Sequence, residues 1–265
     1  MKLWYQSLAR QTEATPYGEA LNRVIKAACD PGTTVHLQGV RKSAGIGVHY
    51  RFLEYNDTQE VMQNAMQAER EGYDAFLIGN ISDAGIRETR EVVNIPVLGL
   101  CETSIHIACM MGATFSFVGI SPKWTPRVME NVYRYGVERR LVAIEPMSTS
   151  PLDLKRCFVD PAHLQYILEQ FNVCAQRLLD KGSEVIIPAG GDIIVFLADA
   201  GIHTVGNAPI LNGIIELVKM GELAVKLKRL TGRFTSKQGG YAAPSGDFLA
   251  RVRKFYGPDV YPGAE

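Results

Sequence analysis

The sequence has no excess of charge of either sign, because its 28 lysines and arginines match its 28 aspartates and glutamates. A neutral chain generates no overall field that would attract nucleic acid or an anionic membrane surface. We therefore expect a small-molecule substrate as partner, and neither nucleic acid nor a membrane.

The sequence also lacks the segments that mark export or membrane insertion. Residues 1–13 contain only a short apolar cluster, and Asp192 and Asp199 interrupt the apolar stretch 184–202. The 5 cysteines are odd in number and include no C-x-x-C pair, which argues against a disulfide framework and a structural zinc site. These absences indicate neither a signal peptide nor a membrane span, and we expect a cytoplasmic protein.

Two catalytic motifs are missing as well. The chain has no G-x-x-x-x-G-K-[ST] loop for nucleotide phosphates and no G-x-S-x-G elbow of an α/β-type serine hydrolase. Glu102 and His106 are spaced i, i+4 and could share a metal ion, but the sequence offers them no third ligand. We expect no metal and no cofactor.

Short β-rich runs alternate with longer amphipathic stretches along nearly the whole chain. With 265 residues, 46% of them hydrophobic, the chain is long enough for one large domain or two lobes. Helical periodicity predicts helices at Thr58–Glu71, His163–Leu179 and Ile214–Leu230. The expected strands are Leu3–Tyr5, Thr34–Leu37, Ala75–Gly79, Val97–Leu100, Thr114–Gly119, Leu141–Glu145, Glu184–Pro188 and Pro209–Leu211. This alternation predicts an α/β fold with parallel sheets.

The chain also repeats itself around residues 68–85 and 177–194. Gly72, Asp74 and Asn80 match Gly182, Glu184 and Gly190, in each case 110 residues later. Two equivalent strand ends imply two similar lobes whose turns face one cleft, because ligands of open parallel sheets bind beyond the carboxyl ends of strands. Chance similarity between two βα units is the alternative. The Gly- and Ser-rich segment 231–246 could close back over the first lobe.

Five segments give these strand ends a recognisable pattern. They resemble the aspartate/glutamate racemase superfamily, nearest its hydantoin racemase branch, over residues 73–86, 96–108, 125–137, 181–193 and 208–220. The resemblance implies two pseudo-symmetric, flavodoxin-like α/β lobes, a discontinuous first lobe of residues 1–107 plus 206–265 and a second lobe of 108–205. It also implies a pair of thiols, one per lobe, that remove and deliver a proton on opposite faces of the substrate carbon.

This sequence departs from the family pattern at those two thiols. The family spacing leads to Asn80 in the first lobe and Gly190 in the second. Asn80 can form hydrogen bonds but cannot act as a base near neutral pH, and Gly190 offers only backbone. The two-thiol mechanism therefore cannot be carried over.

Other groups near the strand ends could supply the chemistry. We expect Asp83 and Asp192 to be the acids and bases, with Asn80 beside them, although an aspartate in a first helical turn also serves as a cap. Ser82, Gly190 and Gly191 leave polar groups free to hold a carboxylate or an enolate oxygen.

Further candidates for contacting the substrate lie elsewhere in the sequence. Cys101, with Glu102 and His106 after it, follows a predicted strand and could be a relocated thiol, although a free cysteine is commonly a small buried hydrophobe. His49 and Arg51 could bind a substrate carboxylate or lie on a solvated loop. Gln6 and Ser7 follow the first predicted strand, where relatives bind polar substrate groups.

These observations predict a cofactor-independent enzyme that acts on a small carboxylate or hydantoin-like cyclic amide without the two-thiol mechanism. Isomerisation, bond cleavage and hydrolysis remain open as its reaction class. The alternative is a non-catalytic binding protein that kept the cleft. We expect the chain to form a homo-oligomer.

Overall fold

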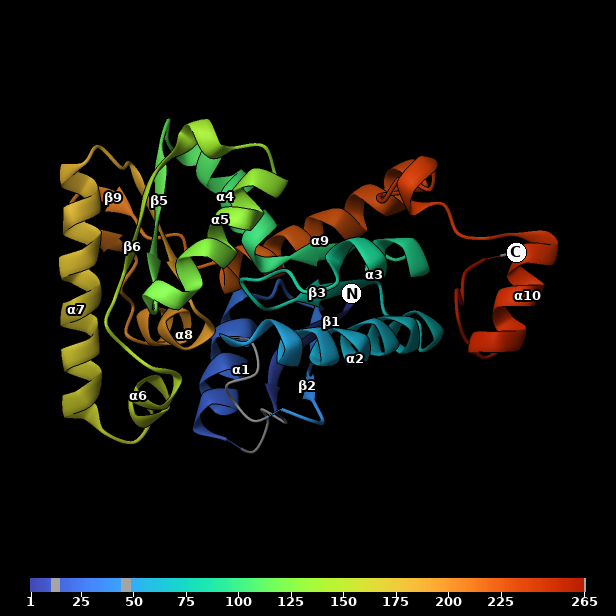
Figure 1. The fold of residues 1–265 in the computed structure, drawn as a ribbon, viewed down its shortest axis with the longest axis horizontal. Coiled ribbons are helices and arrows are strands. Elements are labelled where there is room, and N and C mark those ends of the chain that lie inside the picture. The colour runs from blue at the N-terminus through green and yellow to red at the C-terminus, as the bar shows by residue number, and fades with distance from the viewer. Residues whose placement is uncertain (11–14, 44–48, 265) are drawn as a thin grey trace.

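A computed structural model describes residues 1–10, 15–43 and 49–264, and within them helices and strands alternate along the chain (Figure 1). The strands are β1 (Lys2–Arg10), β2 (Thr34–Val40), β3 (Ala75–Ile78), β4 (Val97–Gly99), β5 (Phe115–Gly119), β6 (Leu141–Pro146), β7 (Val185–Ala189), β8 (Thr204–Val205) and β9 (Ala208–Pro209). The α-helices are α1 (Pro16–Ala28), α2 (Arg51–Arg70), α3 (Ile86–Val92), α4 (Leu100–Met111), α5 (Thr125–Arg134), α6 (Pro151–Arg156), α7 (Pro161–Asp180), α8 (Gly191–Asp199), α9 (Ile214–Thr231) and α10 (Gly246–Tyr256). Short 3₁₀ turns are η2 (Pro122–Trp124), η3 (Glu138–Arg140) and η4 (Gly239–Tyr241).

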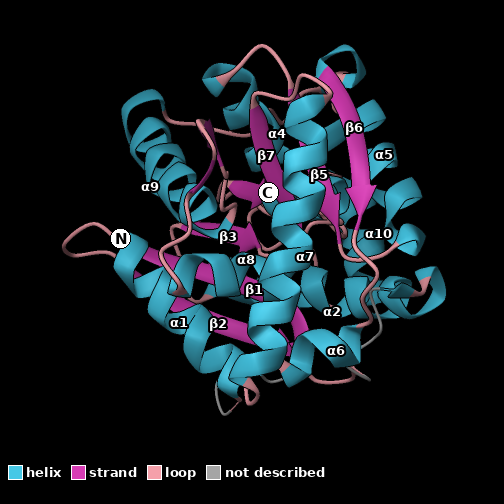
Figure 2. Cartoon of the chain, turned by 90° about the vertical axis from the view of Figure 1, so that its left-hand side faces the viewer, coloured by secondary structure: helices cyan, strands magenta, loops and turns pink. Residues whose placement is uncertain are grey.

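The described strands form two parallel sheets and a small hairpin. The first sheet has the order β2-β1-β3-β4 and the second has the order β6-β5-β7, and their pairings are parallel. Strands β8 and β9 pair in antiparallel fashion. Figure 2 shows helices around both sheets. The predicted α/β fold with parallel sheets is confirmed, and we call each sheet with its helices the first lobe and the second lobe.

Strand β1 explains why helices cover both faces of the first sheet. Neighbouring side chains of a strand point to opposite faces, so Leu3 and Tyr5 pack on one side while Trp4 packs on the other, and all are buried. The Leu3 side is covered by α1 and α9, and the Trp4 side by α2 and α3. A sheet that is apolar on both faces needs this double cover.

The repeat detected in the sequence is a repeat of structure. Gly72 lies between α2 and β3, and Gly182 lies between α7 and β7, each with a positive φ, 73° and 94°. Glycine suits both turns because residues with a side chain rarely adopt this conformation. The matching of the two strand ends across 110 residues is therefore confirmed.

Two elements extend beyond their predicted bounds. Helix α2 begins at Arg51 and not near Thr58. In its first turns Phe52 and Tyr55 are 75% and 68% exposed, so the sequence shows no apolar helix face there from which to predict them. Strand β1 continues to Arg10 and contains Gln6, which was expected to follow it.

The carboxyl-terminal segment lies against the first lobe, as the sequence suggested. Lys237 donates hydrogen bonds to the carbonyl oxygens of Arg90, Glu91 and Val93 at the end of α3. Helix α10 follows at the end of the molecule away from the second sheet (Figure 1). Within the described ranges, no helix is both long and apolar enough to cross a membrane.

The lobe boundaries stay a prediction. The expected break after residue 107 lies inside α4, a helix that packs on β4 of the first sheet and on β5 and β7 of the second. A helix shared in this way offers no flexible linker between the lobes.

Candidate active site

A cavity of about 70 Å³ lies where the two repeated strand ends meet. Asn80, just after β3, and Gly190, just after β7, both line it. The prediction that these positions face one cleft is confirmed. The other described lining residues are Ser7, Leu8, Ala9, Tyr17, Ser43, His49, Gly79, Ile81, Ile120, Trp124, Pro151, Leu154, Lys155, Gly191 and Asp192.

Asn80 can only donate hydrogen bonds to a ligand. Its Oδ1 accepts from the backbone N–H of Ser82 at 2.9 Å and from the Ser82 hydroxyl at 2.7 Å. The backbone donor fixes which end of the amide is oxygen. Among the described residues no hydrogen-bond partner is recorded for Asn80 Nδ2. The turn therefore presents the amide N–H groups to the cavity.

At the second strand end, Gly190 and Gly191 contribute only backbone to the cavity. A Cβ atom at Gly190 would lie 2.4 Å from Cγ2 of Ile120, so a side chain fits there only if Ile120 moves. Helix α8 begins at Gly191, and the first N–H groups of a helix have no partner within it. This strand end can offer N–H donors where the first lobe offers a side chain.

Lys155, Asp192 and Tyr17 form a charged corner of the cavity. Lys155 Nζ lies 2.6 Å from Asp192 Oδ1 and 4.1 Å from the centre of the Tyr17 ring. Burial, and then the charge of Asp192, raises the pKa of Tyr17 far above its ordinary value, so its hydroxyl stays protonated. The ion pair holds the Asp192 carboxylate, whose side chain is 18% exposed, at the cavity wall.

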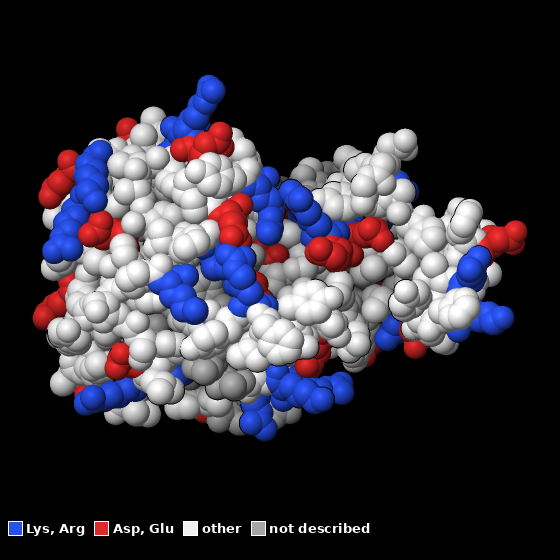
Figure 3. Space-filling model, in the orientation of Figure 1, with Lys and Arg blue, Asp and Glu red and all other residues white. Residues whose placement is uncertain are grey.

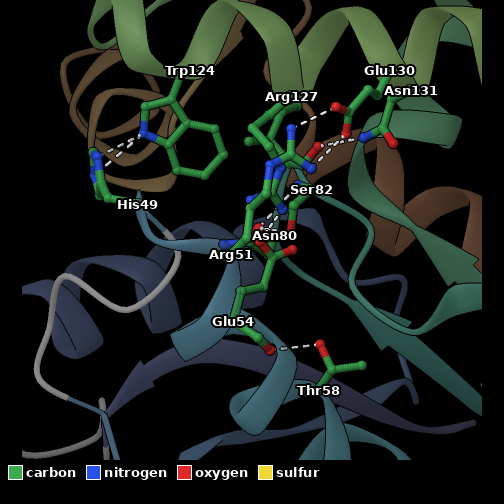
Figure 4. Close-up of polar contacts among 11 residues, drawn as sticks. His49, Arg51, Glu54, Thr58, Asn80, Ser82, Trp124, Arg127, Glu130 and Asn131 are labelled. Atoms are coloured by element: carbon green, nitrogen blue, oxygen red, sulfur yellow. Dashed lines mark hydrogen bonds and ion pairs between the residues drawn. The ribbon is translucent and has the colours of Figure 1, made fainter.

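His49 lies against Trp124 on the first-lobe side. Trp124 Nε1 is 3.0 Å from Nδ1 of His49, and the two rings meet at 82° (Figure 4). Burial, and then the charge of Lys123, lowers the pKa of His49 below its ordinary value. The imidazole is therefore largely neutral at pH 7.

Asp83 does not face Asp192, and that expectation was wrong. Its carboxylate accepts hydrogen bonds from the backbone N–H groups of Cys101 and Glu102 at 2.9 and 2.7 Å, and from the Tyr135 hydroxyl at 2.5 Å. Asp83 thus caps α4 across the sheet instead of the nearby α3 that its position in the sequence suggested. Its φ of 51° turns the side chain away, and it lines a second cavity. A catalytic role for Asp83 stays a prediction.

Ser82 and Arg51 also line the second cavity and not the first. Arg51 forms a bidentate ion pair with Glu130, at 2.5 and 3.0 Å, so the structure separates it from His49. Gln6 is fully buried within the sheet, where its Oε1 accepts from Trp4 and Asn64. Gln6 is therefore not among the residues that line the cavity, and its contact with the substrate stays a prediction; Ser7, next to it, does line the cavity.

Comparisons with known proteins bear on this arrangement. Residues 14–221 match the family model described as Asp/Glu/Hydantoin racemase. This chain belongs to the Asp/Glu/hydantoin racemase family. It is 30% identical over 191 residues to a hydantoin racemase of Pseudomonas sp. (strain NS671), covering 72% of each chain.

Two solved racemase structures share the fold. The allantoin racemase from Klebsiella pneumoniae superposes with a TM-score of 0.76 at 24% identity, over 93% of this chain and 95% of the other. The allantoin racemase of Pseudomonas fluorescens gives 0.78 at 22% identity, over 93% and 98%. The expected racemase-like fold is confirmed.

None of the described residues that line the cavity is a cysteine. Cys101 is completely buried, and burial raises the pKa of its thiol well above the ordinary value. Glu102 forms an ion pair with Arg90, and His106 lies beside the Tyr135 ring. The structure does not bring these three residues to the cavity, because α4 points them toward neighbouring elements.

Sequence reasoning missed Lys155 and Tyr17. Tyr17 lies at the start of α1 and Lys155 in the last turn of α6, and neither stands directly after a strand. No pattern in the sequence marks them, because only the packing of α1 against α8 and of α6 against α8 brings them beside Asp192.

Proposed function

We propose that this chain is a cofactor-independent enzyme that moves a proton at a carbon next to a carbonyl, in a small carboxylate or hydantoin-like cyclic amide, without thiols. The racemase family membership and the relatives named hydantoin racemase support an isomerase. The observation that carries the proposal is the cavity itself. It keeps the position between the two strand ends but holds titratable groups other than cysteine there.

His49 and Asp192 are the acid–base pair in this proposal. His49 comes from the first lobe and Asp192 from the second, which suits a reaction that needs one group for each face of the substrate carbon. In the active form of the enzyme, one of these two residues is protonated and the other is not. That proton is on His49 when Asp192 acts as the base, and on Asp192 when His49 acts as the base.

Asn80 and the start of α8 are the groups proposed to hold the developing negative charge. Removing a proton next to a carbonyl places charge on the carbonyl oxygen, and fixed N–H donors lower the free energy of that state. The Asn80 amide is already oriented by its two hydrogen bonds from Ser82. It needs no rearrangement before it donates.

Lys155 and Tyr17 are proposed as positioning residues. Lys155 fixes one carboxylate oxygen of Asp192 and leaves the other oxygen without a recorded partner among the described residues. The Tyr17 ring supports the ammonium group of Lys155 from 4.1 Å. Together they aim the carboxylate while the tyrosine hydroxyl stays uncharged.

The direct test is proton exchange in D₂O. Pure enantiomers of allantoin and of 5-substituted hydantoins, and a set of small 2-substituted carboxylates, are incubated with the enzyme and followed by NMR and circular dichroism. Isomerisation gives loss of optical activity together with deuterium at the stereocentre. Ring opening or decarboxylation in the same samples would assign cleavage or hydrolysis instead. A compound that raises the melting temperature but never changes would favour the binding-protein alternative.

The dependence of activity on pH tests the pair. Because the pKa of His49 is below its ordinary value of 6.5, kcat/KM should fall as the pH rises from 6 to 8 and the imidazolium form disappears. His49→Gln should remove this dependence along with most of the activity. A rate that stays constant from pH 6 to 8 would contradict the role given to His49.

A further inference from the structure

A second cavity, of about 340 Å³, is lined by the residues that follow Asn80 in the same turn. The turn residues 82–85 form part of its wall, and α2, α3 and α5 supply the rest of the described lining. Its described lining includes arginines from each of these helices, Arg51, Arg87, Arg127 and Arg134. Figure 3 shows basic and acidic side chains interleaved on this side of the molecule.

Two of these arginines are already neutralised. Arg127 pairs with Glu54, and both side chains are largely buried. Arg51 pairs with Glu130 through its two terminal guanidinium nitrogens (Figure 4). These pairs fix the walls of the cavity and leave little charge available to a ligand.

The other two arginines are not paired in this way, and the four lining arginines exceed the three described lining glutamates by one charge. Neither a hydrogen bond nor an ion pair is recorded for Arg87 or Arg134 within the described ranges, and both are exposed. Glu88 is the lining acid that remains without a recorded partner there. Burial raises the pKa of Asp83 to about 7, so its carboxyl is only partly ionised at neutral pH, and its oxygens already accept three hydrogen bonds.

We propose that this second cavity binds a small oxyanion, a carboxylate or a phosphate, through Arg87 and Arg134. A guanidinium group presents a planar fork of N–H donors that matches the two oxygens of such a group. This site is distinct from the cavity that Asp192 lines. The proposal of an oxyanion site does not depend on the proposed function. The turn 80–83 connects the two, because Asn80 lines one cavity while Ser82, which holds Asn80, lines the other.

The test is calorimetric titration of the full chain with inorganic phosphate and, separately, with malonate, each against sodium chloride of the same ionic strength. We expect saturable binding of at least one anion. The double variant Arg87→Gln/Arg134→Gln should weaken it by at least about tenfold, since it removes charge-assisted hydrogen bonds. Binding of phosphate alone would assign a phosphoryl ligand, and binding of malonate alone a carboxylate.

A matched variant controls for net charge. Arg139→Gln/Arg251→Gln removes two exposed arginines that do not line the cavity, and it should bind the anion as the unmodified chain does. Equal weakening in both double variants would overturn the proposal, as would titrations that sodium chloride reproduces. Circular dichroism melting curves confirm that the variants are folded. Exposed arginines that pair with none of the described residues should leave the melting temperature unchanged.

Discussion

The two strand ends that meet in the cavity differ in how the chain continues after the strand and in which groups they contribute. After β3 the chain forms a turn of several residues before α3, and side chains do the bonding: Asn80 to Ser82, and Asp83 to α4. After β7 the helix α8 begins at once, and the contribution is backbone from Gly190 and Gly191. Neither strand end carries a thiol at the matched positions, Asn80 and Gly190. In the proposed function, the first strand end holds a ligand oxygen and the second brings the Asp192 carboxylate.

Asp192→Asn should have the largest effect, because it removes the charged group of the second strand end and keeps its shape. We expect kcat/KM to fall by about 10²- to 10⁴-fold, the range for loss of a general base. Asp199→Asn is the matched control, since Asp199 is in the same helix and is also paired, with Arg23, but does not line the cavity. Activity within about tenfold of the unmodified enzyme would show that the base lies elsewhere.

Asn80→Ala tests the first strand end. Loss of one fixed donor to a developing oxyanion should lower kcat by about 10²- to 10³-fold. Ser82→Ala should lower it less, because the backbone N–H of Ser82 still holds the Asn80 amide. Exposed Asn172 in α7 provides the control Asn172→Ala, for which we expect unchanged kinetics. A variant at Asn80 with raised KM and unchanged kcat would make this residue a binding group alone.

Asp83→Asn should act on stability, in contrast to Asp192→Asn. An asparagine keeps one acceptor oxygen but turns an NH₂ group toward the backbone donors of α4, which costs about 1–3 kcal/mol of unfolding free energy. Denaturant titrations measure this loss, and turnover at a temperature where both proteins are folded should be largely retained. Lost turnover with unchanged stability would instead restore the catalytic role predicted for Asp83 from the sequence.

The pH dependence of the unfolding free energy, compared between the unmodified chain and Asp83→Asn, gives an independent check on the environment of Asp83. Burial raises the pKa of Asp83 from 3.8 to about 7 in the folded state, so the folded chain binds this proton more tightly than the unfolded chain does. The stability that this provides is fully present below pH 3.8 and is lost as the pH rises toward 7. The unfolding free energy of the unmodified chain, relative to Asp83→Asn, should therefore fall across this range. A constant difference would contradict the raised pKa.

Gly190→Ala and Gly191→Ala separate the two glycines of the second strand end. The added methyl group at Gly190 meets Ile120, and we expect a loss of about 1 kcal/mol, since a side chain can turn aside. At Gly191 the nearest atom is Oη of Tyr17 at 3.1 Å, and the change should be smaller. In the Ile120→Ala background the cost of Gly190→Ala should shrink. Equal costs in both backgrounds would show that Ile120 is not the limiting contact.

The smallest expected effect concerns thiols. Turnover should survive iodoacetamide at neutral pH, because no described residue lining the cavity is a cysteine and Cys101 is enclosed. Cys101→Ser and Cys101→Ala should both stay active. A loss of more than about a hundredfold in both variants would indicate a relocated thiol mechanism.

The sequence by itself determined the α/β fold, the repeat, and the meeting of Asn80 and Gly190. Parallel strands end at one edge of a sheet, so positions that follow equivalent strands are brought together whatever the details of packing. For the same reason Asp192, in the first turn after β7, was correctly expected near the cleft.

Only the tertiary structure decided where the remaining side chains point. The sequence predicted one cleft for Asp83 and Asp192, yet the N–H groups of α4 and the Tyr135 hydroxyl attract the Asp83 carboxylate away from it. His49 and Arg51 are two residues apart, but Trp124 and Glu130, from η2 and α5, hold them at different cavities. Lys155 and Tyr17 reach Asp192 because of how their helices dock. Such contacts join residues that are far apart in the chain, so local sequence patterns do not predict them.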